Sequence, residues 1–148
     1  MRRTRKAVPV LLRNGREDME LLAFRHPLAG LQIVKGTVEP GECIEAAAVR
    51  ELEEESGLTC EAGRVLGVWQ NEITNQEWHF VLMHAQTPLQ ESWTHHAPDD
   101  GGHRFNFFWH PLGSSLRQEW HPVFKEAIGW LKSTLAAGDS NQRGGYVA

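Results

Sequence analysis

The stretch Gly36–Leu58, GTVEPGECIEAAAVRELEEESGL, is the most informative part of this chain of 148 residues. Within it Glu51, Glu54 and Glu55 stand at helical spacings of three and four residues, which places three carboxylates on one face of a helix. Like charges so close destabilise an isolated helix, and a hard divalent cation that prefers oxygen ligands would compensate them. The pattern therefore predicts a metal-binding helix, with a solvated acidic face as the alternative.

The residues around these glutamates predict where the helix begins and ends. Pro40 and Gly41 form a turn pair, because Pro presets φ and Gly tolerates positive φ. Glu42 follows at the expected helix start, where a carboxylate is favoured by the helix dipole. Gly57 stands where a helix needs a left-handed C-terminal residue. The apolar residues at helical spacing predict the face that packs on a sheet; they are Ile44, Ala47, Ala48 and Leu52.

The fixed positions of this stretch resemble the Nudix box. That motif reads Gly, five residues, Glu, seven residues, then Arg-Glu-aliphatic-any-Glu-Glu-any-Gly-aliphatic. Here it begins at Gly36, continues with Glu42 and ends with Arg50–Leu58, and every specified position is filled. A chance match of this quality is expected about once in a million chains of this size. The resemblance implies an α/β protein with the Nudix fold, an α/β/α sandwich with a mixed central β-sheet.

The resemblance also implies an activity and a set of site residues. The family hydrolyses the diphosphate (pyrophosphate) bond of a nucleoside diphosphate linked to another group, with Mg²⁺ as the metal and Mn²⁺ as a substitute. Matching positions make Glu51, Glu54, Glu55 and the backbone carbonyl of Gly36 the expected metal ligands. Glu51 and Glu54 are both candidates for the base that activates water, and Arg50 is expected to orient one of the carboxylates.

Three residues outside the glutamate cluster are candidate substrate contacts. Arg25 lies at the end of an expected strand, where many family members keep a cation that contacts phosphate; a solvated charge is the alternative. Lys35 precedes the box glycine and would contact phosphate or offset the acidic helix. Trp78 stands on an expected strand and would stack on a base or belong to the core.

Further candidates are the acids of a polar loop, and the motif pattern also bears on the substrate class. Glu91, Asp99 and Asp100 lie in a long polar loop and are candidates for a further acid at the site. Departures from the motifs of other Nudix branches favour nucleoside triphosphates or similar small nucleotides over ADP-ribose and dinucleoside polyphosphates. Two alternatives stay open: a non-catalytic Nudix-like module that senses a nucleotide or binds a protein, and a diphosphate isomerase.

Composition and charge indicate which partners and which cellular compartment to expect. The net charge of −4 argues against a duplex nucleic acid partner, which requires clustered Lys and Arg. No stretch is long and apolar enough to predict a membrane span. Cys43 and Cys60 flank the expected helix, roughly 25 Å apart, so we expect reduced thiols and a cytoplasmic protein. A homodimer is compatible with the family, although no residue pattern indicates one.

The remaining sequence predicts alternating strands and helices in one domain over residues 1–135. Strands are expected at 7–13, 20–25, 31–34, 65–71, 77–85 and 104–109, with a turn near Thr74 and Asn75. The segment 87–103 is rich in Pro, His, Asp and Gly and predicts a loop. An amphipathic helix is expected at 122–135, and the composition of 136–148 predicts a flexible tail.

Overall fold

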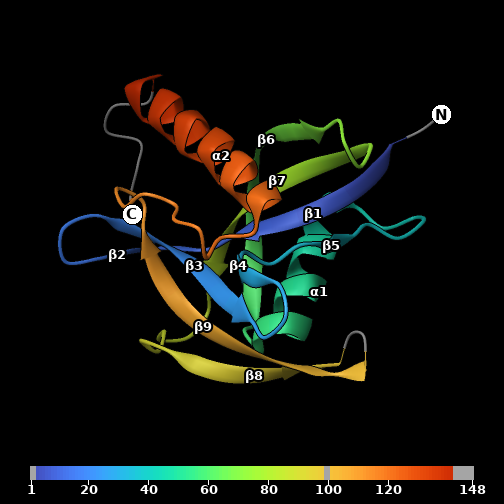
Figure 1. Ribbon diagram of the computed structural model, residues 1–148. Coiled ribbons are helices and arrows are strands. Elements are labelled where there is room, and N and C mark those ends of the chain that lie inside the picture. Colours follow the sequence, from blue (N-terminus) through green and yellow to red (C-terminus); the bar gives the residue numbers. More distant parts are fainter. Residues whose placement is uncertain (1–2, 99–100, 142–148) are drawn as a thin grey trace.

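The computed structural model describes residues 3–98 and 101–141, which form two β-sheets and two helices (Figure 1). The strands are β1 Thr4–Val10, β2 Leu12–Asn14, β3 Met19–His26, β4 Gly30–Gln32, β5 Gly36–Thr37, β6 Cys60–Asn71, β7 Gln76–Ala85, β8 Trp93–Ala97 and β9 His103–Pro111. The helices are α1 Ile44–Ser56 and α2 Pro122–Asn141.

The strands pair into two curled sheets. The first sheet has the order β5-β1-β7-β6, and the second has the order β2-β3-β9-β8, with β4 added to β3. Strands β1 and β7 run parallel, and the other paired strands of the two sheets run antiparallel. The prediction of a mixed α/β fold is therefore confirmed, with the strands divided between two sheets.

Successive residues of the central strands face two different cores, and this places the helices on opposite sides of β1 (Figure 1). In β1, Ala7 packs into the core beneath α1, whereas Val8 packs into the core beneath α2. Leu22 and Leu21 of β3 divide in the same way. Side chains alternate across a strand, so a continuous apolar run is the pattern of a strand buried on both faces.

We name these two clusters by the helix that covers each. The α1 core contains Ala7, Leu22, Phe24, Ala47, Ala48, Leu52, Val81 and Phe107 among its buried members. The α2 core contains Val8, Val10, Leu21, Trp78, Phe80, Trp120, Phe124 and Leu131 among its buried members.

One predicted strand is two strands in the structure. The expected strand 7–13 divides at Leu11, because β1 pairs with β7 in the first sheet and β2 pairs with β3 in the second. The chain thus crosses between sheets within an uninterrupted apolar run. The predicted hairpin of 65–71 and 77–85 is confirmed as β6 and β7, and Asn75 at its turn has a φ of 55°.

Two other predicted boundaries were wrong. The expected loop 87–103 contains β8, which pairs along its length with β9. Helix α2 continues past residue 135 to Asn141, because Ala136 and Ala137 are strong helix formers. Residues 142–148 of the expected tail lie outside the described residues, as do Asp99 and Asp100. Within the described ranges, neither helix has the length and apolar character needed to cross a membrane.

Candidate metal centre

Helix α1 carries the acidic face, and local chemistry sets both of its ends. Cys43 is the N-cap residue, and its Sγ accepts a hydrogen bond from the Ala46 amide at 3.4 Å. Gly41 in the preceding turn and Gly57 at the C-cap have φ values of 78° and 80°, as the sequence predicts. Glu42 lies just before the cap, and its carboxylate accepts a hydrogen bond from the Glu39 amide at 3.0 Å.

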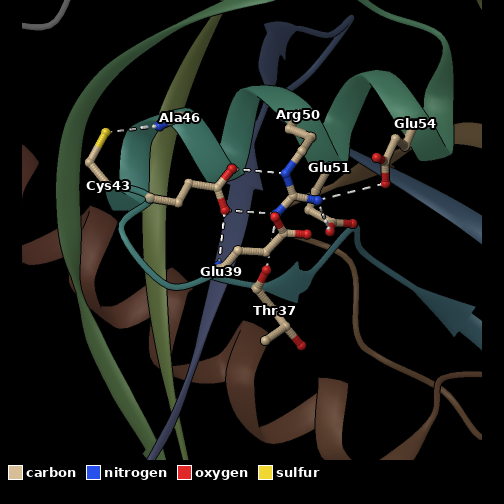
Figure 2. A network of polar contacts seen from close by, with 8 residues as sticks. Thr37, Glu39, Cys43, Ala46, Arg50, Glu51 and Glu54 are labelled. Carbon is tan, nitrogen blue, oxygen red and sulfur yellow. Dashed lines mark hydrogen bonds and ion pairs between the residues drawn. The ribbon is translucent and has the colours of Figure 1, made fainter.

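Arg50 connects the acidic residues of the site (Figure 2). Its Nε and Nη2 donate to the two carboxylate oxygens of Glu42 at 2.8 Å each, and its Nη1 donates to Glu51 Oε1 at 2.7 Å. The Oε2 of Glu54, one helical turn away, lies 3.8 Å from Nη1. Arg50 therefore pairs most directly with Glu42 and Glu51, and only at longer range with Glu54. Its Nη2 also donates to the carbonyl of Thr37 at 3.0 Å.

This network changes the titration of its members. Hydrogen bonds from Arg50 and then from the Glu39 amide lower the pKa of Glu42 to about 2. The carboxylates of Glu42 and Glu51 in turn raise the pKa of Arg50 above its ordinary value, and the hydrogen bond to Glu42 is the larger cause. Because one guanidinium is shared by three carboxylates, negative charge is left over on this face of α1.

The box glycine allows a close approach of the Glu51 side chain. Gly36 lies in β5, opposite Ala7 of β1, and a methyl group on Gly36 would overlap the carboxylate of Glu51. A larger residue here would displace that carboxylate from its present position, in which Glu51 as a residue is 7% exposed. The backbone of Gly36 and the side chain of Glu51 are therefore adjacent, as the sequence predicts for two ligands of one metal.

A cavity of about 230 Å³ adjoins the acidic helix face at Glu55. Glu55 is 8% exposed, and Lys35 lines the same cavity. Burial lowers the pKa of Lys35, and the nearby Lys6 adds to that effect. Glu55 and Glu51 act in the opposite direction, since a neighbouring carboxylate favours the charged ammonium. Lys35 Nζ lies 5.3 Å from the centre of the Trp78 ring and 5.9 Å from that of Phe124, at the side of the cavity that faces the α2 core.

Two other candidates form ion pairs with residues outside the glutamate cluster. Arg25 is half-exposed at the end of β3, and its Nη2 bonds to Glu119 Oε2 at 2.9 Å. Glu91 accepts two hydrogen bonds from Arg13, at 3.0 and 2.9 Å, which tie this loop acid to β2.

The expectation that Trp78 would stack on a base does not agree with the structure. Trp78 is 1% exposed, lies in the α2 core, and contacts the rings of Trp69 and Phe124. Its indole nitrogen donates to Gln76. The side chain has no exposed face for a ligand, because the even-numbered positions of β7 here face α2 rather than the site.

The donor set fits a hard divalent cation. Glu51, Glu54, Glu55 and the Gly36 carbonyl offer oxygen atoms only, which is the preference of Mg²⁺ and Mn²⁺. Among the described residues, no three acidic, His or Cys side chains already converge on one point. In this arrangement the carboxylate of Glu51 accepts a hydrogen bond from Arg50.

Sequence reasoning missed several residues around the site. His26, Gln32 and His103 line the cavity beside Glu55 and Lys35. Trp93 and His95 of β8 contact the last turn of α1. These side chains come from strands distant in sequence, so no short spacing reveals them. The only available signal was the total of eight histidines.

Comparison with known proteins agrees with this arrangement. A profile of the NUDIX domain matches residues 3–131. The chain is 34% identical over 90 residues to mouse diphosphoinositol polyphosphate phosphohydrolase 3-alpha. The aligned stretch covers 60% of this chain and 55% of that protein. The chain thus spans about half the length of the curated relatives it matches.

Solved structures show the same fold. The solution structure of the Escherichia coli ORF135 protein superposes with a TM-score of 0.64, at 23% identity, over 93% of this chain and 94% of that one. A Caenorhabditis elegans Ap4A hydrolase superposes with a TM-score of 0.62, at 19% identity, over 94% of this chain and 99% of that one.

Proposed function

This chain belongs to the NUDIX family, and from that membership we propose that it is a metal-dependent pyrophosphohydrolase. Nudix hydrolases act on pyrophosphate bonds and generally need a divalent metal. The observation that carries the proposal is the complete box on α1, with the carboxylate of Glu51 held between Arg50 and Gly36.

The proposed metal ligands are Glu51, Glu54, Glu55 and the carbonyl of Gly36, with Mg²⁺ as the metal and Mn²⁺ as a substitute. When bound, the metal neutralises charge on the diphosphate and lowers the pKa of a coordinated water. Arg50 limits the repulsion among these carboxylates while the site is assembled, since it already contacts two of them.

Glu54 is the stronger candidate for the base that takes the proton of water. Its side chain is 40% exposed and its contact with Arg50 is 3.8 Å long, so it is the more accessible carboxylate. Glu51 is buried against Gly36 and bonded to Arg50, which suits a fixed ligand. A base must reach the attacking water without first breaking strong contacts.

We propose that the substrate's phosphates extend from α1 towards Lys35, which lines the same cavity as Glu55. Small nucleotides such as nucleoside triphosphates are the first substrate class to test. A densely phosphorylated small molecule is the second, because His26, His103 and Lys35 share the cavity and the curated relatives include diphosphoinositol polyphosphate phosphohydrolases. Arg25 is a secondary candidate, since phosphate would compete with Glu119 for it.

Placement in the cell and assembly stay predictions. The free thiols of Cys43 and Cys60 are compatible with the reducing cytoplasm that we propose. A single catalytic domain over residues 1–135 and a homodimer are likewise proposals.

The test is a screen for release of phosphate and pyrophosphate with Mg²⁺, over nucleoside triphosphates, nucleotide sugars, dinucleoside polyphosphates, ADP-ribose and inositol pyrophosphates. We expect Glu54→Gln to keep the fold and lower turnover at least about a hundredfold, the usual size of a lost acid–base contribution. The matched control is Glu53→Gln, the same change at an exposed neighbour whose carboxylate accepts a hydrogen bond from the Thr59 hydroxyl.

The outcomes separate the competing functions. Turnover in wild type and Glu53→Gln, with loss in Glu54→Gln, supports the hydrolase and identifies its substrate class. Rearranged product without released phosphate would indicate an isomerase. Near-normal turnover in Glu54→Gln would contradict the assignment of the metal helix, and Mg²⁺ binding without any turnover would favour a non-catalytic module.

A further inference from the structure

The last turn of α1 is electrostatically unfavourable by its own sequence. It contains Glu53, Glu54 and Glu55 and no basic residue. Carboxylates in this position face the negative end of the helix dipole and repel one another. The final backbone carbonyls of a helix also lack partners within it. Groups outside α1 are therefore needed to hold this turn.

Two side chains of β8 supply hydrogen-bond donors to that turn. Trp93 Nε1 donates to the carbonyl of Ser56 at 2.9 Å, and His95 Nε2 lies 3.0 Å from the carbonyl oxygen of Glu54. A carbonyl oxygen only accepts, so Nε2 of His95 carries the hydrogen in this contact. Positions 93 and 95 share one face of the strand because side chains alternate.

Both side chains are also fixed by packing. The indole of Trp93 stacks on Phe107 of β9, with ring centroids 5.1 Å apart and an interplanar angle of 8°. The ring of His95 lies against Gly57, where an added Cβ would come within 3.0 Å of its Nδ1. The two donors are therefore held rigidly by β9 on one side and by the helix end on the other.

We propose that Trp93 and His95 are positioning residues that hold the backbone of the last turn of α1, and with it the positions from which Glu54 and Glu55 bind the divalent metal. Their hydrogen bonds to that turn are made to backbone carbonyls, so they act through the turn and not on the substrate. The metal part of this inference rests on the proposed function, whereas the fixing of the turn does not.

The strand offers a matched pair of variants for the test. His95→Phe removes the donor and keeps a ring of similar size over Gly57. His96→Phe is the control, because His96 lies on the opposite, exposed face of β8 and contacts Arg104 rather than α1. Trp93→Phe is a second test variant, since it removes the indole N–H and keeps the stack on Phe107.

Two measurements read out the effect without relying on turnover. Amide hydrogen exchange of residues 53–57 is followed in the metal-free protein, and Mn²⁺ affinity is measured by electron paramagnetic resonance. We expect His95→Phe and Trp93→Phe each to accelerate exchange and to weaken Mn²⁺ binding roughly fivefold, the effect of one lost hydrogen bond. His96→Phe should match wild type in both.

The outcomes are distinguishable. Exchange in both test variants that equals that of His96→Phe would overturn the inference. Faster exchange with unchanged Mn²⁺ affinity would overturn the positioning role, since the contacts would then be merely structural. Failure of wild type to bind Mn²⁺ would overturn the proposed metal function, and the exchange comparison would still decide whether β8 holds the turn.

Discussion

At the scale of single residues, Arg50 partly balances the negative charge of the acidic face of α1. Its guanidinium is bidentate with Glu42 and also bonds to Glu51. Bidentate pairs are stronger and more directional than single contacts. Two separate needs are consistent with the spacing of the box, because Glu42 secures Arg50 and the later glutamates are the proposed metal ligands.

The Glu42–Arg50 pair predicts a pH-dependent stability. The folded pKa of Glu42 is about 2, below its ordinary value of 4.5, so the charged form is favoured by folding. The stabilisation is therefore complete above pH 4.5 and is lost as the pH falls towards 2. We expect Glu42→Gln to lower the free energy of unfolding by roughly 1–2 kcal/mol at pH 7.

Urea denaturation of wild type and Glu42→Gln at pH 7 and at pH 3 measures this effect. The difference between the two proteins should shrink at the lower pH. Glu39→Gln is the control, because the contact of Glu39 with Glu42 uses its backbone amide and not its carboxylate. A difference of equal size at both pH values would contradict the prediction.

The site glutamates could be predicted from sequence, but their surroundings could not. Glu51, Glu54 and Glu55 belong to one local motif, whose spacing alone places them on one helix face. The cavity residues His26 and His103 come from different strands, and only the pairing of the sheets brings them together. Trp78 was misassigned for a related reason, because the two faces of a strand buried on both sides have similar composition.

At the scale of elements, α1 was predictable because its signals are local. A turn pair, an acidic start, an apolar stripe and Gly57 all lie within a few residues of the helix. Strand β8 was not predictable in this way. Exposed Thr94 and His96 alternate in it with the partly buried Trp93 and His95, and it is a strand because β9 and α1 lie beside it.

Two glycines in different backbone settings, Gly57 at the C-cap of α1 and Gly129 inside α2, predict opposite effects of substitution by Ala on stability. Gly57 has a φ of 80° and lies under the ring of His95, so Gly57→Ala adds backbone strain and a close contact. We expect the free energy of unfolding to fall by about 1–2 kcal/mol. Gly129 lies inside α2, where an added Cβ meets no atom within 4 Å. Gly129→Ala should raise the free energy of unfolding by about 0.5–1 kcal/mol.

Thermal denaturation at pH 7 compares both variants with wild type. The two glycines differ only in backbone conformation and surroundings, so each serves as the control for the other. Stabilisation by Gly57→Ala would show that the left-handed cap is not needed at the end of α1.

At the scale of the whole molecule, the two cores share their strands. Residues of β1 alternate between the α1 core and the α2 core, as Ala7 and Val8 do. A change that loosens one face of such a strand also removes support from the other. The proposed single domain therefore predicts one cooperative unfolding transition, in which both helices are lost together.

Paired substitutions in the two cores test this coupling. Leu131 of α2 and Leu52 of α1 are both buried, and each change to Ala should cost about 2–5 kcal/mol. Tryptophan fluorescence and far-ultraviolet circular dichroism should report the same urea midpoint for each variant.

Mn²⁺ affinity should distinguish the two variants, because Leu52 follows Glu51 on the acidic helix whereas Leu131 lies in α2. Leu131→Ala should bind Mn²⁺ as wild type does, and Leu52→Ala more weakly. Two transitions in Leu131→Ala, with α2 lost first, would show that the α2 core folds as a unit of its own and that the site does not depend on it.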